Sequence, residues 1–389
     1  MRVGAFVLAA QFPGQGHGEP LHRAVRTAEL VEQTGLDSVW LAEHHFVPYG
    51  VCPSAVTLAA LLLGRTRRIG VGTAVSVLPN THPVALAEQT ALLQLTSGGR
   101  FTLGVGRGGP WVDLEVFGGG LRAYEHGFPE ALDLVLRWLR EPRVGTDGER
   151  YQFREVDVVP HSGVPQSSRP PVVVACTSPR TVRLAARRAL PLLLGMHSDD
   201  EEKAETVAMW RREARAAGHD GDVIEEAASL LVSVGVAQVA DRTEEAVGAL
   251  TRAMPAWLGE GLAAHRTVDG RQRSMRDPLG YTQLLCGLHP VGTPRLCADR
   301  LAATAERTGI SRFALLVEGT GELAATERNV RRLGEEVLPQ LPMHHHSPPP
   351  PRSDGPAPQH AAAAHGSSGS AARGADLRPL SSRGVPATG

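Results

Sequence analysis

The stretch Ser38-Val39-Trp40-Leu41-Ala42-Glu43-His44-His45-Phe46 joins a short apolar run to a polar cluster. The run at 38–42 predicts a buried strand, and Glu43, His44 and His45 come directly after that strand ends. In parallel barrels the catalytic groups lie at this end of the strands. Histidine suits proton transfer near neutral pH, although a His pair can also be ordinary polar packing. Polar residues at the ends of the other predicted strands decide between these two interpretations.

Short apolar runs alternate with helical patterns along most of the chain. Strands are predicted at 3–8, 38–42, 69–74, 101–105, 171–175, 191–194, 229–237 and 312–317. Helices are predicted at 22–34, 53–64, 83–96, 128–139, 202–217, 244–257, 295–308 and 323–337. Eight alternating units favour an α/β fold of the (β/α)8 TIM barrel type. The alternative, a doubly wound open sheet, usually carries a GxGxxG turn after its first strand, and residues 9–16 do not fit that spacing.

Three segments depart from this alternation. Residues 145–166 contain Tyr151-Gln152-Phe153 and a second apolar run at 156–159, which together predict a small inserted hairpin. Residues 259–289 lack a clear period, so we predict a long loop there and a candidate lid. Residues 343–389 are rich in Pro, Ala, Gly and Ser and are predicted to be disordered. The chain thus divides into a barrel domain at 1–342 and a disordered tail at 343–389.

The overall composition excludes several classes of protein. The 389 residues carry 40 Lys and Arg against 41 Asp and Glu, which gives no general attraction to nucleic acid or to an anionic membrane. No apolar run reaches the roughly 18–20 residues of a membrane-spanning helix, and residues 1–7 resemble a strand more than a signal peptide. The four cysteines form no CxxC pair, so neither a metal site nor a disulfide framework is expected, and a cytoplasmic protein is predicted.

Polar clusters also lie directly after the third, fourth and fifth predicted strands, at 75–83, 106–109 and 176–181. Ser178 with Pro179 predicts a helix start, where free N–H groups and hydroxyls can hold a phosphate, although Ser178 can equally be a simple cap. The guanidinium of Arg107, between two glycines, can bind a phosphate with two hydrogen bonds, although it can also be a surface arginine. In a parallel barrel these clusters share one rim with His44, which favours a pocket there.

The ordered set of motifs resembles bacterial luciferase and related flavin-dependent monooxygenases. The motifs are Trp40-Leu41-Ala42-Glu43-His44-His45-Phe46, Val71-Gly72-Thr73-Ala74, Leu78-Pro79, His82-Pro83-Val84, Glu88, Gly99-Arg100-Phe101, Gly106-Arg107-Gly108, Val116-Phe117-Gly118 and Pro290-Val291-Gly292-Thr293-Pro294. Each motif is loose, but their order is specific and covers nearly all of residues 1–341. The resemblance implies a (β/α)8 barrel, in agreement with the strand count.

The resemblance also implies a cofactor and its site. The family uses reduced FMN supplied by a separate flavin reductase, or the deazaflavin F420 in another branch. His44 is the implied catalytic histidine, and the Ala74-Val75 peptide matches a frequent non-proline cis bond beneath the flavin ring. The implied cofactor-binding residues are Glu43, Ala74, Val75, Gly106, Arg107, Thr177, Ser178 and Thr181. Arg107 and the 177–181 segment would bind the flavin phosphate. The luciferases carry a cysteine where this chain has Gly106, a change expected to affect pocket shape.

We therefore expect a monooxygenase that uses reduced FMN and O2 through a flavin C4a-hydroperoxide. Its substrate would be a hydrophobic aldehyde, ketone or natural-product intermediate of secondary metabolism. One alternative is an F420-dependent oxidoreductase that transfers a hydride without oxygen. Another is a non-catalytic flavin-binding partner subunit, but such subunits of luciferase lack the first His and the phosphate-site Arg, which His44 and Arg107 supply here. The resemblance further implies a homodimer through the helices at 53–64 and 83–96.

Overall fold

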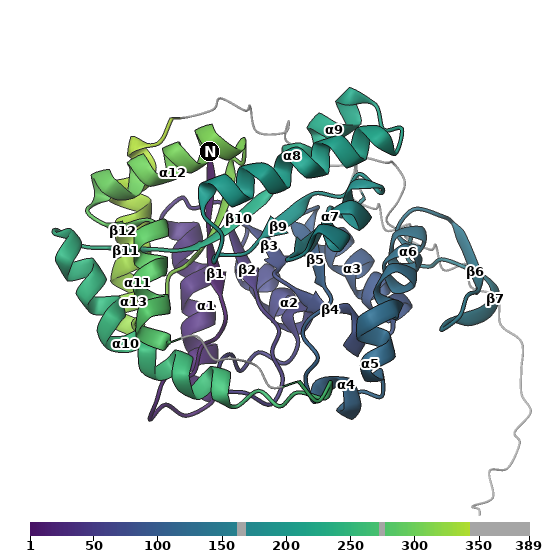
Figure 1. Ribbon diagram of the computed structural model, residues 1–389, viewed down its shortest axis with the longest axis horizontal. Helices are drawn as coiled ribbons and strands as arrows, with labels where there is room; N and C mark the ends of the chain where they lie inside the picture. The colour runs from purple at the N-terminus through teal and green to yellow at the C-terminus, as the bar shows by residue number, and fades with distance from the viewer. Residues whose placement is uncertain (162–168, 272–276, 343–389) are drawn as a thin grey trace, which may run out of the picture. The chain divides into compact units, whose positions relative to one another are not determined.

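Eight parallel strands close into a barrel in the computed structural model, which describes residues 1–161, 169–271 and 277–342 (Figure 1). In ring order the strands are β1 (Arg2–Val7), β2 (Ser38–Leu41), β3 (Gly70–Thr73), β5 (Phe101–Gly106), β8 (Val172–Cys176), β9 (Leu192–Leu194), β10 (Val232–Val236) and β13 (Arg312–Leu316). The ring closes because β3 pairs with β5 and β1 pairs with β13. The predicted (β/α)8 barrel is therefore confirmed, and every predicted strand corresponds to one of these eight.

Helices surround the strands, and the predicted ones are present with ends shifted by a few residues. They are α1 (Gly18–Gln33), α2 (Ala55–Arg65), α3 (Pro83–Ser97), α6 (Phe128–Trp138), α8 (Asp200–Ala216), α10 (Thr243–Ala263), α12 (Pro294–Thr308) and α13 (Leu323–Arg332). Three more lie between them: α7 (Pro179–Ala186), α9 (Gly221–Ala228) and α11 (Pro278–Leu288). Shorter elements near the rim are β4 (Ser76–Val77), α4 (Asp113–Val116) and α5 (Gly120–Arg122), and β11 (Gln238–Val239) pairs with β12 (Val291–Gly292). The predicted start of α7 at Ser178-Pro179 is confirmed.

The predicted hairpin exists, but its strands are placed differently. Parts of both predicted apolar runs, 152–153 and 156–157, lie in one strand, β7 (Gln152–Asp157), which pairs in antiparallel fashion with β6 (Arg143–Asp147). Arg143 lies 3.0 Å from a carboxylate oxygen of Glu155 and 3.2 Å from one of Asp157, so charge pairing rather than apolar alternation marks this register. The end of the predicted segment, 162–166, lies outside the described residues.

The predicted long loop at 259–289 is wrong for most of its length. Helix α10 continues to Ala263, and α11 covers Pro278–Leu288 and packs along α10. Asp277 caps α11 by accepting hydrogen bonds from the N–H groups of Leu279 and Gly280, and Pro278 occupies the first turn. Asp before Pro is a helix-start signal that outweighs the weak apolar period of this segment. The predicted lid also included residues 272–276, which lie outside the described part, as does the predicted tail at 343–389.

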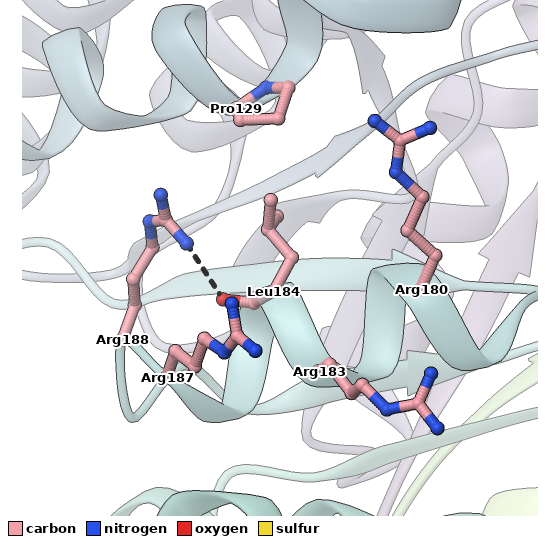
Figure 2. Close-up of a pocket in the computed structure, with 6 residues that line it drawn as sticks. All are labelled: Pro129, Arg180, Arg183, Leu184, Arg187 and Arg188. Atoms are coloured by element: carbon pink, nitrogen blue, oxygen red, sulfur yellow. Dashed lines mark hydrogen bonds between the residues drawn. The ribbon is translucent and has the colours of Figure 1, made fainter. Parts of the chain in front are cut away.

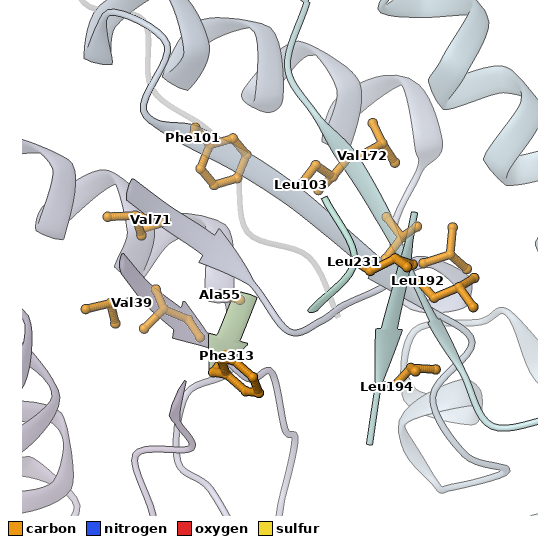
Figure 3. Packing of buried hydrophobic residues seen from close by; sticks show 14 of the residues in the cluster. Val39, Ala55, Val71, Phe101, Leu103, Val172, Leu192, Leu194, Leu231 and Phe313 are labelled. Carbon is orange, nitrogen blue, oxygen red and sulfur yellow. The ribbon is translucent and has the colours of Figure 1, made fainter. Parts of the chain in front are cut away.

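Alternation along each strand divides the core into an outer and an inner layer. In β1, Val3, Ala5 and Val7 pack outward against the helices, whereas Phe6 joins an inner cluster that also contains Trp40 of β2. Figure 3 shows the outer layer, with side chains of β2, β3, β5, β8, β9 and β13 gathered in one apolar cluster. This two-residue period is what a closed barrel requires, because one face of each strand fills the interior and the other carries the helices.

A buried ion pair fixes the carboxyl ends of β1 and β13. Arg23 of α1 donates to Glu318 over 3.0 Å, and both side chains are only 1% exposed. The other oxygen of Glu318 accepts a hydrogen bond of 2.8 Å from the backbone N–H of Leu8. Such a pair is tolerated in a core only when its remaining polar atoms are also bonded. No helix among residues 1–161, 169–271 and 277–342 is long and apolar enough to cross a membrane.

Candidate active site

The strand period continues past β2 and separates Glu43 from His44. Glu43 lies on the outward parity, where its two carboxylate oxygens accept hydrogen bonds from the N–H of Ala55 at the start of α2 (3.2 Å) and of Val77 in β4 (3.1 Å). Nε2 of His45 lies 3.6 Å from the same carboxylate. Glu43 therefore ties three segments of the rim together.

His44 lies on the inward parity, in a neutral and desolvated setting. Its backbone N–H donates to the carbonyl of Cys52 over 2.9 Å, which fixes the loop that carries it. Burial lowers the pKa of His44 to about 3, with smaller contributions from His265 and His45. Its buried Nδ1 atom has no hydrogen-bond partner among the described residues. An uncharged imidazole with a buried nitrogen left unbonded is costly unless a ligand or a proton transfer uses it.

Aromatic rings surround His44 on one side. The ring of Tyr49 meets His44 edge-on with centroids 5.1 Å apart, and Trp257 of α10 stacks on Tyr49 at 5.0 Å. The Trp257 indole donates to the Tyr49 carbonyl over 3.1 Å and also stacks on Phe12 at 5.4 Å. Burial raises the pKa of the Tyr49 hydroxyl. These rings make the wall beside His44 apolar and rigid. None of them was predicted, because their positions at 12, 49 and 257 share no sequence pattern.

The peptide between Ala74 and Val75 is cis, as the resemblance implied. Gly106, at the end of the neighbouring strand β5, lies against it: a Cβ atom on Gly106 would approach Cγ2 of Val75 to 2.5 Å. Val75 therefore fills the space that a cysteine side chain at position 106 would need. The structure therefore brings the predicted residues Val75 and Gly106 together between β4 and β5. These two residues are called the floor of the site below.

Arg107 comes directly after Gly106, the last residue of β5. Its guanidinium carbon lies 4.2 Å from the centroid of the Tyr124 ring, a cation–π contact. Among the described residues the guanidinium has no hydrogen bond or ion pair that would hold it there, so its donors remain free for a ligand. A planar guanidinium with free donors is suited to binding a phosphate.

The predicted residues after β8 form a hydroxyl cluster at the start of α7. Ser178 caps the helix by accepting a hydrogen bond of 3.4 Å from the N–H of Thr181, and the two hydroxyl oxygens lie 3.0 Å apart. Thr177 and Ser178 line a cavity of about 140 Å³. The strands β5 and β8 are neighbours, so Arg107 and this cluster leave adjacent positions on the rim. Arg107 itself does not line the cavity.

The structure brings some of the predicted residues together and leaves others apart. Val75 and Gly106 lie against each other, and Ser178 and Thr181 share the hydroxyl cluster with Thr177 beside them. Glu43 contacts His45, which is not one of the predicted site residues, and His44 and Arg107 contact Tyr49 and Tyr124 instead. The described residues contain no cluster of three or more His, Cys, Asp or Glu side chains arranged to hold a metal ion. The four cysteines are buried and unpaired, and burial raises the pKa of each thiol. A neutral imidazole, an aromatic wall and a cluster of hydroxyls therefore lie at this rim of the barrel.

Comparison with known proteins shows which sequences and structures this chain is similar to. The alkanal monooxygenase alpha chain of the Kryptophanaron alfredi symbiont is 29% identical over 359 residues, which cover 88% of this chain and 98% of that protein. The oxygenating constituent of 3,6-diketocamphane monooxygenase from Pseudomonas putida, solved with FMN, has a TM-score of 0.68 at 19% identity over 88% of this chain and 99% of that one. An F420-dependent secondary alcohol dehydrogenase, solved with an F420–acetone adduct, has a TM-score of 0.65 at 18% identity over 88% and 99%.

At these identities the two solved structures establish the fold alone. The family is established from the sequence instead. The family model of the luciferase-like monooxygenases matches residues 1–312, which is most of the chain. The matched region contains seven of the eight barrel strands and the first residue of the eighth, together with every rim group described above. The chain therefore belongs to the luciferase-like monooxygenase family, whose members are enzymes.

Proposed function

We propose that this protein binds reduced FMN at the carboxyl rim of its barrel and uses O2 to oxygenate a hydrophobic organic substrate. The observation that carries the proposal is the buried, unbonded Nδ1 of His44 beside an aromatic wall. When bound, reduced flavin supplies the electrons that activate O2, and the protein supplies orientation, electrostatics and exclusion of water. The similarity to an alkanal monooxygenase supports this chemistry.

Different rim residues would hold different parts of the cofactor. Val75 packs against Gly106, and these two residues offer an apolar floor against which a flat ring can lie. Arg107 and the hydroxyls of Thr177, Ser178 and Thr181 offer donors for the phosphate. Glu43 holds the floor in place through its bonds to Ala55 and Val77. The apolar floor suits the flavin ring, and the polar donors, which lie apart from it, suit the phosphate.

His44 is the proposed acid/base residue. Its pKa of about 3 makes it neutral near pH 7, so it enters the reaction as a hydrogen-bond partner rather than as a cation. A negative charge developing next to it would raise that pKa and allow the imidazole to take up a proton. The aromatic rings exclude water from the space beside His44. The lower local dielectric strengthens the effect of such a charge on the pKa of His44.

The wall also restricts the substrate. Tyr49 lies beside His44 and is backed by the buried rings of Trp257 and Phe12, and these apolar, uncharged surroundings suit a hydrophobic aldehyde, ketone or natural-product intermediate of secondary metabolism. The name alkanal monooxygenase of one relative and the Baeyer–Villiger activity stated for a structural neighbour both concern carbonyl compounds. A cytoplasmic flavin reductase is the proposed supplier of the reduced cofactor.

A homodimer through α2 and α3 completes the proposal. Leu61 on α2 is 49% exposed, and Leu92 and Leu95 on α3 are 53% and 49% exposed. Exposed leucines on two adjoining helices leave apolar surface that a second copy of the chain would cover. The relatives include both alpha and beta chains of alkanal monooxygenase, so pairing of subunits also fits the family.

The test is an anaerobic titration of the purified protein with FMNH2 and, separately, with F420H2. Tight binding of FMNH2 and then consumption of O2 when air is admitted would support the proposal. Binding of F420H2 alone, with no O2 consumed, would replace it with hydride transfer. Binding of FMNH2 with no reaction in any carbonyl substrate screen and no effect of His44→Ala on flavin reoxidation would favour a non-catalytic flavin-binding subunit.

A further inference from the structure

Lys203 is a buried cation without a close partner. It lies in the first turn of α8, and the residue is only 3% exposed. Its backbone N–H donates to the carbonyl of Asp199 over 3.1 Å, but its ammonium forms no hydrogen bond, and no ion pair within 4.0 Å, with any residue in the described part of the chain. A lysine is almost never fully buried unless it is paired, because the cost of removing an ammonium from water is large.

Asp199 and Asp200, the two carboxylates that favour the charged form of Lys203, have other partners. Asp199 caps α8 by accepting a hydrogen bond of 2.9 Å from the N–H of Glu202. Asp200 accepts a hydrogen bond of 2.8 Å from Thr304 and lies 3.9 Å from Arg307. Burial lowers the pKa of Lys203, and the two aspartates only partly oppose this effect. The first turn of a helix is also the end where a cation is disfavoured by the helix dipole. The contacts of Lys203 within the protein therefore do not explain why a lysine is buried at this position.

Lys203 lines the same cavity as the hydroxyl cluster. The cavity of about 140 Å³ is bounded by Thr177, Ser178, Lys203 and Thr206, with Cys176 and Met209 as apolar neighbours. Its volume suits several water molecules or one phosphate group. The starts of α7 and α8 both open onto it, because Ser178 and Ser198 are among its lining residues. Two helix N-termini, several hydroxyls and one ammonium make a cavity that favours a dianion.

We propose that Lys203 binds the phosphate of the flavin in this cavity. The inference rests on the proposed function and deepens it, since a phosphomonoester carries close to two negative charges at neutral pH. Arg107 lies over Tyr124 and outside the cavity lining, so Lys203 supplies the charge on the side of α8. The phosphate would pair with the ammonium of Lys203, for which the protein itself provides no partner.

The solvent-facing side of α7 offers a matched control. Figure 2 shows a separate surface pocket in which Leu184 points towards Pro129 of α6 and Arg180 and Arg188 lie to either side. Arg187 lines that pocket and not the cavity of Lys203. Arg187→Met therefore removes one positive charge from the neighbourhood without touching the proposed phosphate subsite. It separates a specific contact from a general change in surface potential.

The experiment compares dissociation constants for FMN and for riboflavin, which lacks the phosphate. Lys203→Met should weaken FMN binding by on the order of tenfold or more and leave riboflavin binding unchanged. Arg187→Met should leave both unchanged. Equal weakening of both ligands by Lys203→Met would make the lysine a structural residue, and no weakening of either would overturn the inference. If Lys203→Met does not fold, Lys203→Gln takes its place, because it keeps a polar end group at similar length.

Inorganic phosphate tests the subsite independently of the flavin. Phosphate should raise the melting temperature of the wild type and of Arg187→Met, but not that of Lys203→Met. In phosphate-free buffer Lys203→Met should melt at the same or a higher temperature, because a desolvated charge has been removed. If phosphate acts through Lys203 and no flavin binds, the subsite stands and the proposed function fails. Equal stabilisation of all three proteins by phosphate would overturn the subsite.

Discussion

At the scale of single residues, His44 owes its properties to its surroundings rather than to its sequence motif. The pair His44-His45 looks symmetrical in sequence, yet the strand period sends the two rings to different places. Each ring has a buried nitrogen without a hydrogen bond, but Nε2 of His45 lies 3.6 Å from the Glu43 carboxylate, whereas His44 meets the ring of Tyr49 and forms no ion pair with a carboxylate of the described residues. The motif predicted which His would be catalytic only through the family resemblance. Its neutral state results from burial and could not be predicted from the motif.

Replacing His44 by Ala should lower the turnover rate by about 10²–10⁴-fold, the usual contribution of a general acid or base. Binding of reduced FMN should change little, because the phosphate and ring contacts remain. Steady-state kinetics and an anaerobic titration measure the two effects separately. His219→Ala is the control, since His219 is half-buried, lies outside the rim and places its ring 3.0 Å from the Arg187 carbonyl. Undiminished turnover in His44→Ala would remove the catalytic assignment.

Gly106 and Val75 should be energetically coupled. Gly106→Ala places a Cβ atom 2.5 Å from Cγ2 of Val75, and the displacement should cost about 1–3 kcal/mol of unfolding free energy. Val75→Ala in the same chain should recover most of this loss by making room. Urea denaturation of the two single variants and the double variant measures the coupling. Gly287→Ala is the control, because nothing lies within 4 Å of a Cβ atom there. Strictly additive effects would contradict the contact.

At the scale of elements, two helices begin in the same way but are expected to differ in function. Ser54 caps α2 and Ser178 caps α7, and each hydroxyl also contacts a threonine three residues later. Only Ser178 lines the cavity that contains Lys203. The sequence predicted the cap at Ser178 from its pairing with Pro179. It could not show that the cap faces a cavity, because that depends on how α7 packs against α8.

Ser54→Ala and Ser178→Ala should each lower the unfolding free energy by about 1 kcal/mol through loss of a cap. Ser178→Ala alone should also weaken FMN binding relative to riboflavin. Chemical denaturation and fluorescence titration of both variants give the two quantities. If both variants, or neither, lose FMN affinity, then the hydroxyl at 178 has no role beyond capping.

Strands and helices were predictable to different degrees. The eight barrel strands carry continuous apolar runs because both of their faces are buried, and this made them visible in sequence. Helix α11 was missed because its apolar period is weak and its start lies at Asp277-Pro278, within a segment rich in Gly and Arg. The hairpin was predicted with its strands displaced, since β7 is mostly exposed and its register depends on charge pairs with Arg143. Exposed elements leave little hydrophobic pattern to interpret.

At the scale of the whole molecule, two buried histidines make stability depend on pH. Burial is the main cause that lowers the pKa of His44 to about 3 and that of His289 to about 4. The unfolded chain has histidine pKa values near 6.5, so between about pH 6.5 and these lower values it binds more protons than the folded chain. The contribution of these groups to stability is complete above about pH 6.5 and is lost as the pH falls.

The free energy of unfolding should therefore be lower at about pH 5 than at about pH 7.5. Urea denaturation at the two pH values measures the difference. His289→Gln should reduce that difference, because one of the two buried groups no longer titrates. His219→Ala should leave it intact. A difference that is the same in all three proteins would show that His289 does not contribute.

Assembly is the remaining property at this scale. Leu92→Lys on α3 should shift the protein from a dimer towards a monomer at micromolar concentration, because it places a charge on the proposed apolar interface. Sedimentation velocity measures the shift. Leu284→Lys is the control, since Leu284 lies on α11 and is similarly exposed at 46%. A wild type that sediments as a monomer would contradict the proposed dimer.

The most direct test of the central claim mixes the anaerobic complex of the protein and FMNH2 with O2 and records the flavin absorbance over time. A monooxygenase with a dry rim should reoxidise its flavin far more slowly than free FMNH2 does, with a transient spectrum unlike that of reduced or oxidised FMN. Reoxidation as fast as that of free flavin, or binding of F420H2 alone with no reaction with O2, would contradict the account.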